Sequence, residues 1–241
     1  MTERNASVRV GILTCLSSLL TGCLTTQDVA VSEPNDVAAA EQEVAAPGAA
    51  KHHDIALPSD TNWDVYSSYQ LERNAYLGKA QRVCTNATSQ AECPAGAVVY
   101  GNGGSYWNAR IDACDGKAGW IWAPGVTGAS YPAELAEYYF VNHVLVPASP
   151  SSAQVIVAAD DQAEVIINGA AVGTIGSITD FNVAWADQNK PTAINIASAL
   201  VTGMNTITVR AANGPGAFTN CTNCTYQQNP AGVVFCVDVR F

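Results

Sequence analysis

The feature that most constrains the fold is a series of short apolar segments, separated by Gly, Pro, Asn and Asp, that runs from Trp63 to the C-terminus. No long segment shows the apolar period of about 3.6 residues that an amphipathic helix requires. Regularly spaced short strands with turn residues between them are typical of a β-sandwich or jelly roll. The sequence therefore predicts an all-β domain, with strands over 63–66, 97–100, 119–122, 137–146, 154–158, 163–167, 193–196, 205–212 and 233–240.

Two of these segments carry sharper signals. Asn168-Gly169 lies between apolar runs within 165–173, and this dipeptide suits the positive φ angles of a two-residue hairpin turn. The last segment alternates with a period of two, which is the pattern of a strand with one face toward the core. The side chains predicted to face the core are Val233, Phe235, Val237 and Val239.

The composition of the chain argues against some classes of binding partner. Hydrophobic residues make up 48% of the 241 residues, enough for a sizeable core, whereas charged residues make up only 13%. The formal net charge is -10, and no stretch concentrates Lys or Arg. An acidic surface repels phosphate, so we expect no nucleic-acid partner and no attraction to anionic lipid headgroups.

The N-terminus has the organisation of an export signal. Arg4 and Arg9 lie around the start of an apolar stretch over 10–20, which is shorter than the ~20 residues that span a bilayer. Leu20-Thr21-Gly22-Cys23 follows, and this run resembles the bacterial lipobox. The resemblance implies a signal peptide over 1–22, acylation of Cys23, and an anchor of acyl chains in the outer membrane.

The segment after that cysteine is predicted to be a tether. Residues 24–58 lack aromatic side chains and are rich in Ala, Glu, Pro and Val. Such a segment buries too little apolar area to offset the entropy of ordering it. We therefore divide the chain into a lipidated, flexible tether over 23–58 and a β-sandwich domain over 59–241, on the periplasmic or extracellular face of the cell envelope.

Seven motifs in the second half resemble a known fold family. They are AGWIWAPG at 118–125, YYF at 138–140, AADD at 158–161, VIING at 165–169, GMNTITV at 203–209, Asn213, and NPAGVVF at 229–235. In this order they resemble the galactose-binding-domain-like β-sandwich of bacterial sugar-binding modules and secreted surface proteins. The resemblance covers 118–241 and implies a jelly roll that binds carbohydrate or protein, although a fold alone does not fix a function.

Six cysteines remain after cleavage and lipidation, and an even number in an exported protein predicts three disulfides. We expect Cys84 to pair locally with Cys93, and Cys114 and Cys236 to compete for Cys221 and Cys224. The spacing of Cys221-Thr222-Asn223-Cys224 also leaves open a redox pair or half of a zinc knuckle.

The sequence offers ligand-binding candidates rather than a catalytic motif. It holds neither a G-x-S-x-G elbow nor H-E-x-x-H nor a phosphate-binding loop, so we expect no enzyme. Aromatic residues beside amides or carboxylates could stack on sugars, with core packing as the alternative role for each ring. These candidates are Tyr106, Trp107, Trp185, Asp187 and Tyr226. Asp160 and Asp161 are candidates for a structural calcium ion.

Together these observations predict a surface-anchored lipoprotein whose sandwich is a non-catalytic, adhesive module for a glycan or a surface protein. The alternative is a structural component of an envelope complex that binds no small ligand.

Overall fold

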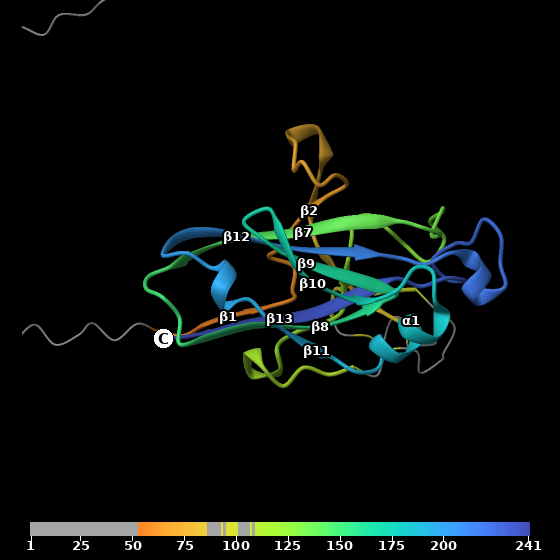
Figure 1. Ribbon diagram of the computed structural model, residues 1–241. Helices are drawn as coiled ribbons and strands as arrows, with labels where there is room; N and C mark the ends of the chain where they lie inside the picture. Colours follow the sequence, from red (N-terminus) through yellow and green to blue (C-terminus); the bar gives the residue numbers. More distant parts are fainter. Residues whose placement is uncertain (1–52, 86–92, 94, 101–106, 108) are drawn as a thin grey trace, which may run out of the picture. The chain divides into compact units, whose positions relative to one another are not determined.

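The computed structural model describes residues 53–85, 93, 95–100, 107 and 109–241, which form two β-sheets packed face to face (Figure 1). The predicted all-β, jelly-roll sandwich is thereby confirmed. In this part of the chain no helix has the length and hydropathy needed to cross a membrane. Cys23, the signal peptide and most of the tether lie outside the described residues and remain predictions.

The first sheet has seven strands in the order β11-β8-β13-β6-β4-β5, with β1 also paired to β13. β1 runs antiparallel beside residues 236–239 of β13, and β6 pairs with the same strand at Val233. The bounds are β1 (Ile55–Pro58), β4 (Gln81–Cys84), β5 (Val98–Val99), β6 (Ile121–Trp122), β8 (Ser152–Asp160), β11 (Thr192–Asn195) and β13 (Gly232–Arg240).

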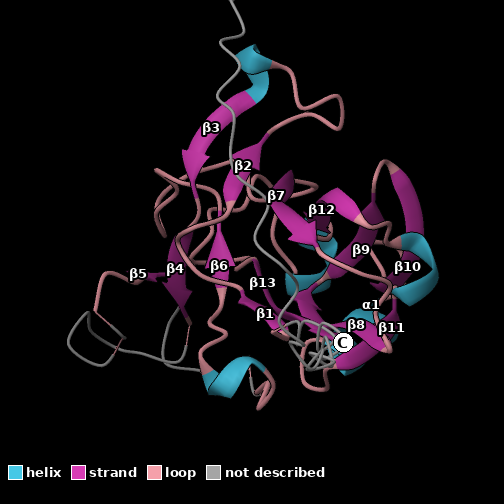
Figure 2. Cartoon of the chain, turned by 90° about the vertical axis from the view of Figure 1, so that its left-hand side faces the viewer, coloured by secondary structure: helices cyan, strands magenta, loops and turns pink. Residues whose placement is uncertain are grey.

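The second sheet has six strands in the order β10-β9-β12-β7-β2-β3, so β10 and β3 form its edges (Figure 2). The bounds are β2 (Asp64–Tyr66), β3 (Tyr76–Lys79), β7 (Glu137–Val146), β9 (Gln162–Ile167), β10 (Ala170–Gly176) and β12 (Gly203–Ala212). Helix α1 (Phe181–Asp187) connects β10 of this sheet to β11 of the other. Short 3-10 turns lie at Arg73–Ala75, Cys114–Gly116, Ala197–Ala199 and Gly216–Thr219.

The core lies between the sheets and is rich in aromatic rings. Trp122 is fully buried, and its ring packs edge-on against Tyr138 at 5.3 Å. Phe235 packs edge-on against Trp63 at 4.6 Å, which joins the start of the domain to its last strand. The four alternating residues of that strand belong to this core, as predicted: Val233, Phe235, Val237 and Val239.

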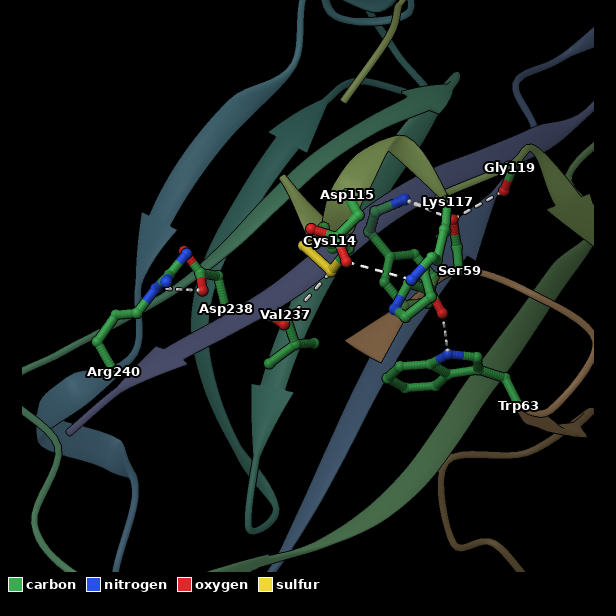
Figure 3. Close-up of a disulfide and its surroundings, with 12 residues drawn as sticks. Ser59, Trp63, Cys114, Asp115, Lys117, Gly119, Val237, Asp238 and Arg240 are labelled. Atoms are coloured by element: carbon green, nitrogen blue, oxygen red, sulfur yellow. Dashed lines mark hydrogen bonds and ion pairs between the residues drawn. A yellow bond between two sulfur atoms is a disulfide. The ribbon is translucent and has the colours of Figure 1, made fainter. Parts of the chain in front are cut away.

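Strand β13 is buried on its other face as well. Val234 and Cys236 belong to a second apolar cluster, which Ala109, Ile111 and Cys114 cover from outside the sandwich. A disulfide joins Cys114 to Cys236, and Figure 3 shows it beside β13. A strand buried on both faces reads as a continuous apolar run, which explains the sequence VVFCV within β13.

The hairpin predicted at Asn168-Gly169 is confirmed. The two residues have φ angles of 51° and 84°, and Ile167 pairs with Ala170 across the turn. The Asn168 side chain also accepts a hydrogen bond from the Thr206 backbone N–H at 2.9 Å. The turn is therefore attached to β12 as well as to its own strands.

The boundary between tether and domain lies earlier than the sequence suggests. β1 occupies Ile55–Pro58, which the sequence composition places at the end of the tether, and it pairs with β13 over its whole length. The Ser59 backbone N–H continues this pairing by donating to the Phe235 carbonyl at 2.8 Å. The extended conformation of β1 depends on its pairing with β13, which is distant in the sequence. Its four residues are too few to show a pattern that predicts a strand.

The disulfides correct one prediction and confirm another. Cys84 pairs with Cys93, as expected. Cys114 pairs with Cys236, and Cys221 pairs with Cys224, so the expected competition between these cysteines does not occur. The reason is topological: the segment carrying Cys114 lies over the outer face of β13, whereas the other two cysteines close their own loop.

Candidate ligand-binding pocket

A cavity of about 550 Å³ opens at one end of the sandwich, and we call it the end pocket. Its floor is the turn from β8 to β9, and its sides are α1, the turn Gly216–Thr219 with the residues after it, and the loop over 227–230. Figure 1 shows α1 at the end of the sandwich opposite the C-terminus. The pocket is thus formed by four segments, and the β8–β9 turn, α1 and the two segments within 218–230 are far apart in the sequence.

Two neighbouring carboxylates form the floor. Asp160 ends β8, Asp161 precedes β9, and the peptide bond between them is cis. The Trp107 indole Nε1–H donates to Asp160 Oδ2 at 2.7 Å, and the Gly214 backbone N–H donates to Asp161 Oδ2 at 2.6 Å. Both side chains are buried, and each has a hydrogen bond that fixes its direction.

Burial controls the protonation of this pair. It raises the pKa of Asp160 well above the usual range, and the adjacent charge of Asp161 adds to the shift. Burial also raises the pKa of Asp161, although the Gly214 N–H opposes this shift. The hydrogen bond between the two carboxyls raises the pKa of Asp160 and lowers that of Asp161, which favours the proton on Asp160, so the pair offers both a donor and acceptors.

The protonation of Asp160 makes a testable contribution to stability. Its pKa lies above the value of 3.8 expected for an unfolded chain, so the folded state holds the proton more tightly, and stability falls as pH rises above about 4. Asp160→Asn keeps an acceptor for Trp107 and removes this titration. We expect the variant to be more stable than the wild type at pH 7, with the difference vanishing toward pH 4.

Urea unfolding at several pH values measures this difference. Asp115→Asn is the matched control, because the side chain of Asp115 is 82% exposed. Parallel stability profiles for Asp160→Asn and the wild type would contradict the raised pKa.

Three aromatic rings line one side of the pocket. Phe181 and Trp185 come from α1 and are 44% and 45% exposed, and Phe218 comes from the 3-10 turn. The ring centroids of Phe181 and Phe218 lie 5.5 Å apart. Asp180 caps α1 by accepting from the Asn182 N–H at 2.9 Å. Exposed rings held in this way can stack on the C–H face of a ligand.

Amide side chains line the pocket as well. Asn229 is buried, and its Nδ2 donates to the Gly214 carbonyl at 3.2 Å. Gln228 Oε1 accepts from the Thr225 backbone N–H at 3.0 Å. Gln227 and Gln188 also line the cavity. Each amide has a donor and an acceptor group, so together they suit ligands that carry hydroxyl groups.

A disulfide closes the loop beside the rings. Cys221 lines the pocket and is bonded to the buried Cys224, whose backbone N–H donates to Glu134 Oε1 at 2.9 Å. Among the described residues, these three form the one cluster of three His, Cys, Asp or Glu side chains close enough to hold a metal. With both sulfurs joined in a disulfide, the cluster has no thiolate to offer a zinc ion.

The calcium site predicted at Asp160 and Asp161 has only part of a ligand set. Both carboxylates face the pocket, but within the described ranges no third acidic side chain joins them. Calcium takes about six to eight oxygen ligands, so the site would need ligand or water oxygens in addition. The calcium assignment remains a prediction.

The predicted ligand-binding residues do not lie together in the structure. Trp185 lines the end pocket, and its role in ligand binding stays a prediction. Trp107 is buried and stacks on Trp120 at 4.5 Å, so its role is to hold Asp160. Trp107 and Trp185 therefore do not share one open groove. Tyr106 lies outside the described residues.

The other two candidates have structural roles. Tyr226 is 2% exposed, and its ring packs on Tyr100 at 5.2 Å within the core, so it cannot stack on a ligand. Asp187 accepts from the Gly176 backbone N–H at 2.6 Å and thereby fixes the end of α1. Among the lining residues that the sequence interpretation missed are Phe181, Gln188, Phe218 and Asn229.

In comparisons with known proteins, the chain resembles parts of some solved structures. The sequence matches no protein-family model and no curated protein. Among similar solved structures, the Streptomyces avermitilis alpha-L-rhamnosidase complexed with L-rhamnose is 28% identical over 49% of this chain and 10% of its own, with a TM-score of 0.36. A lectin from Pleurotus ostreatus in complex with GalNAc is 21% identical over 50% of this chain and 29% of its own (TM-score 0.33).

The Lactobacillus rhamnosus beta-glucuronidase is 12% identical over 79% of this chain and 29% of its own, with a TM-score of 0.37. The chain thus covers less than a third of each of these three proteins. At such low TM-scores, the function of this chain has to be argued from its own pocket.

Proposed function

We propose that the end pocket binds a neutral carbohydrate and that the domain is a non-catalytic binding module. The observation that carries this proposal is the combination, in one cavity, of aromatic rings, amide side chains and a buried carboxyl pair with a raised pKa at Asp160. A sugar ring has an apolar C–H face and a rim of hydroxyls. The C–H face matches the rings, and the hydroxyls match groups that both donate and accept hydrogen bonds.

The charge of the pocket supports a neutral ligand. Among the described residues that line it, none is Lys, Arg or His, and two are aspartates. A uronic acid or a phosphorylated sugar would bring a negative charge to the buried pair without a cation to offset it. We therefore expect neutral sugars to bind and their acidic counterparts to be rejected.

The arrangement of the carboxyls supports binding rather than hydrolysis. A glycosidase places its two carboxyls on either side of the scissile bond, about 5 to 9.5 Å apart. Asp160 and Asp161 are sequence neighbours, are hydrogen-bonded to each other, and are each engaged by a further N–H group. They lie together on one side of any ligand in the pocket.

We further propose that the module is anchored in the cell envelope through an acylated Cys23. The lipobox-like run at 20–23 and the three disulfides, which persist in oxidising compartments, support this anchor. Within the domain, β1 starts at the end of the sandwich opposite α1 (Figure 1). Mass spectrometry of the native N-terminal peptide tests this anchor, and an unmodified residue 1 would contradict it.

Isothermal titration calorimetry of the full chain tests carbohydrate binding. The panel contains neutral monosaccharides, including the L-rhamnose and N-acetylgalactosamine named with two of the similar structures, and glucuronic acid as the acidic comparison. We expect at least one neutral sugar to bind saturably and glucuronic acid to give no heat of binding. The proposal fails if no neutral mono- or oligosaccharide binds.

Trp185→Ala should weaken sugar binding by about 2 kcal/mol, roughly 30-fold in Kd, because the ring supplies a stacking surface. The fold should persist, since Trp185 is 45% exposed. Tyr76→Ala is the matched control, because Tyr76 is 44% exposed and lies on β3, away from the pocket. Equal affinities for the wild type and Trp185→Ala would show that the ligand binds elsewhere.

A further inference from the structure

One polar side chain of the end pocket has no hydrogen-bond partner in the described part of the chain. Gln188 is only 4% exposed and lines the cavity, yet its side-chain amide makes no hydrogen bond there. Its backbone N–H is satisfied, because it donates to the Ala184 carbonyl at 3.1 Å. Because Gln188 is not among the residues whose buried side-chain N or O atoms lack a partner, its amide is open to the cavity and can hydrogen-bond to whatever occupies it.

The position of Gln188 directs its side chain to the ligand-facing side of α1. Phe181, Trp185 and Gln188 follow the spacing i, i+4 and i+7, which places them on one face of a helix. All three line the pocket. Ala184 is fully buried and holds the helix against the sandwich. The amide is thus next to the exposed rings in space.

The residues on both sides of Gln188 hold its backbone in place. Asp187 accepts from the Gly176 N–H at 2.6 Å, and the Asn189 side chain donates to the Trp185 carbonyl at 2.9 Å. A side chain that is buried and attached to a fixed backbone has little rotamer freedom left to lose. A hydrogen bond from a ligand to this amide therefore costs little conformational entropy.

We propose that Gln188 contacts the ligand directly, with its carbonyl oxygen accepting from one sugar hydroxyl and its NH2 group donating to another. This inference rests on the proposed carbohydrate-binding function and assigns a specificity-determining residue within it. An amide that needs both a donor and an acceptor selects for hydroxyl groups over hydrogens at that position. A deoxy analogue would leave the buried amide unpaired and should bind more weakly.

Gln188→Met separates a ligand contact from a structural role. Methionine has nearly the same length and no polar group, and because the Gln188 amide lines the cavity without a protein partner in the described residues, the replacement should change the stability of the free protein little. Affinity for the best neutral sugar should fall at least tenfold. Gln154→Met, on β8 and outside the pocket lining, is the matched control and should bind as the wild type does.

Nuclear magnetic resonance of the full chain gives a second readout. The side-chain amide signals of Gln188, assigned by their loss in Gln188→Met, should shift when the sugar is added. Sugar binding by Gln188→Met within twofold of the wild type, or a clear loss of stability in this variant, overturns the inference while the proposed function stands. No sugar binding by the wild type overturns both.

Discussion

Replacing both Cys114 and Cys236 with alanine is expected to lower the free energy of unfolding by about 4 kcal/mol. The two cysteines are 122 residues apart in sequence, and a disulfide that closes so long a loop strongly restricts the unfolded chain. It also holds the segment around Ala109 and Ile111 over the outer face of β13. Urea unfolding without reductant measures the loss.

The local disulfide is the matched control for this prediction. Cys84 and Cys93 are only 9 residues apart, so replacing both with alanine should cost roughly 2.3 kcal/mol less on loop entropy alone. If the two double variants lose the same stability, or if the Cys84/Cys93 variant loses more, the long-range disulfide is not the main covalent constraint on the sandwich.

Phe235→Ala should have an effect of similar size, with a loss of about 3–5 kcal/mol. Phe235 lies in the middle of β13, is fully buried, and packs edge-on against Trp63. Removing the ring leaves a cavity where the last strand meets the first segment of the domain. Urea unfolding followed by tryptophan fluorescence reports this loss.

Leu145→Ala is the control for Phe235→Ala, because Leu145 is 64% exposed on β7 and should cost less than about 0.5 kcal/mol. A loss below about 1 kcal/mol for Phe235→Ala would mean that β13 does not have the central place in the core described here.

The sequence predicted those parts of the fold that local pattern determines. The alternation within 233–240 and the Asn168-Gly169 turn specify their own conformation, and both are confirmed. β1 and α1 were missed for different reasons. β1 has four residues whose extended state depends on pairing with β13, and α1 has seven residues, too few for a helical period to stand out.

The site was harder to predict because it depends on contacts between distant segments. Tyr226 and Gln227 are adjacent, yet the first is in the core and the second lines the pocket, and loop sequences carry no period that would separate them. Trp107 has its role through Asp160, which is 53 residues away. The helical spacing of Phe181, Trp185 and Gln188 is the one local signal of the pocket in the sequence. This spacing becomes informative only when a helix is assumed at these positions.

A crystal structure of the protein with its best neutral sugar tests the central claim most directly. Our account predicts density for one sugar ring in the end pocket, with its C–H face on Trp185 and its hydroxyls within hydrogen-bond distance of Gln188 and the Asp160–Asp161 pair. A sugar bound at another surface of the sandwich, with the end pocket filled by water alone, would contradict it.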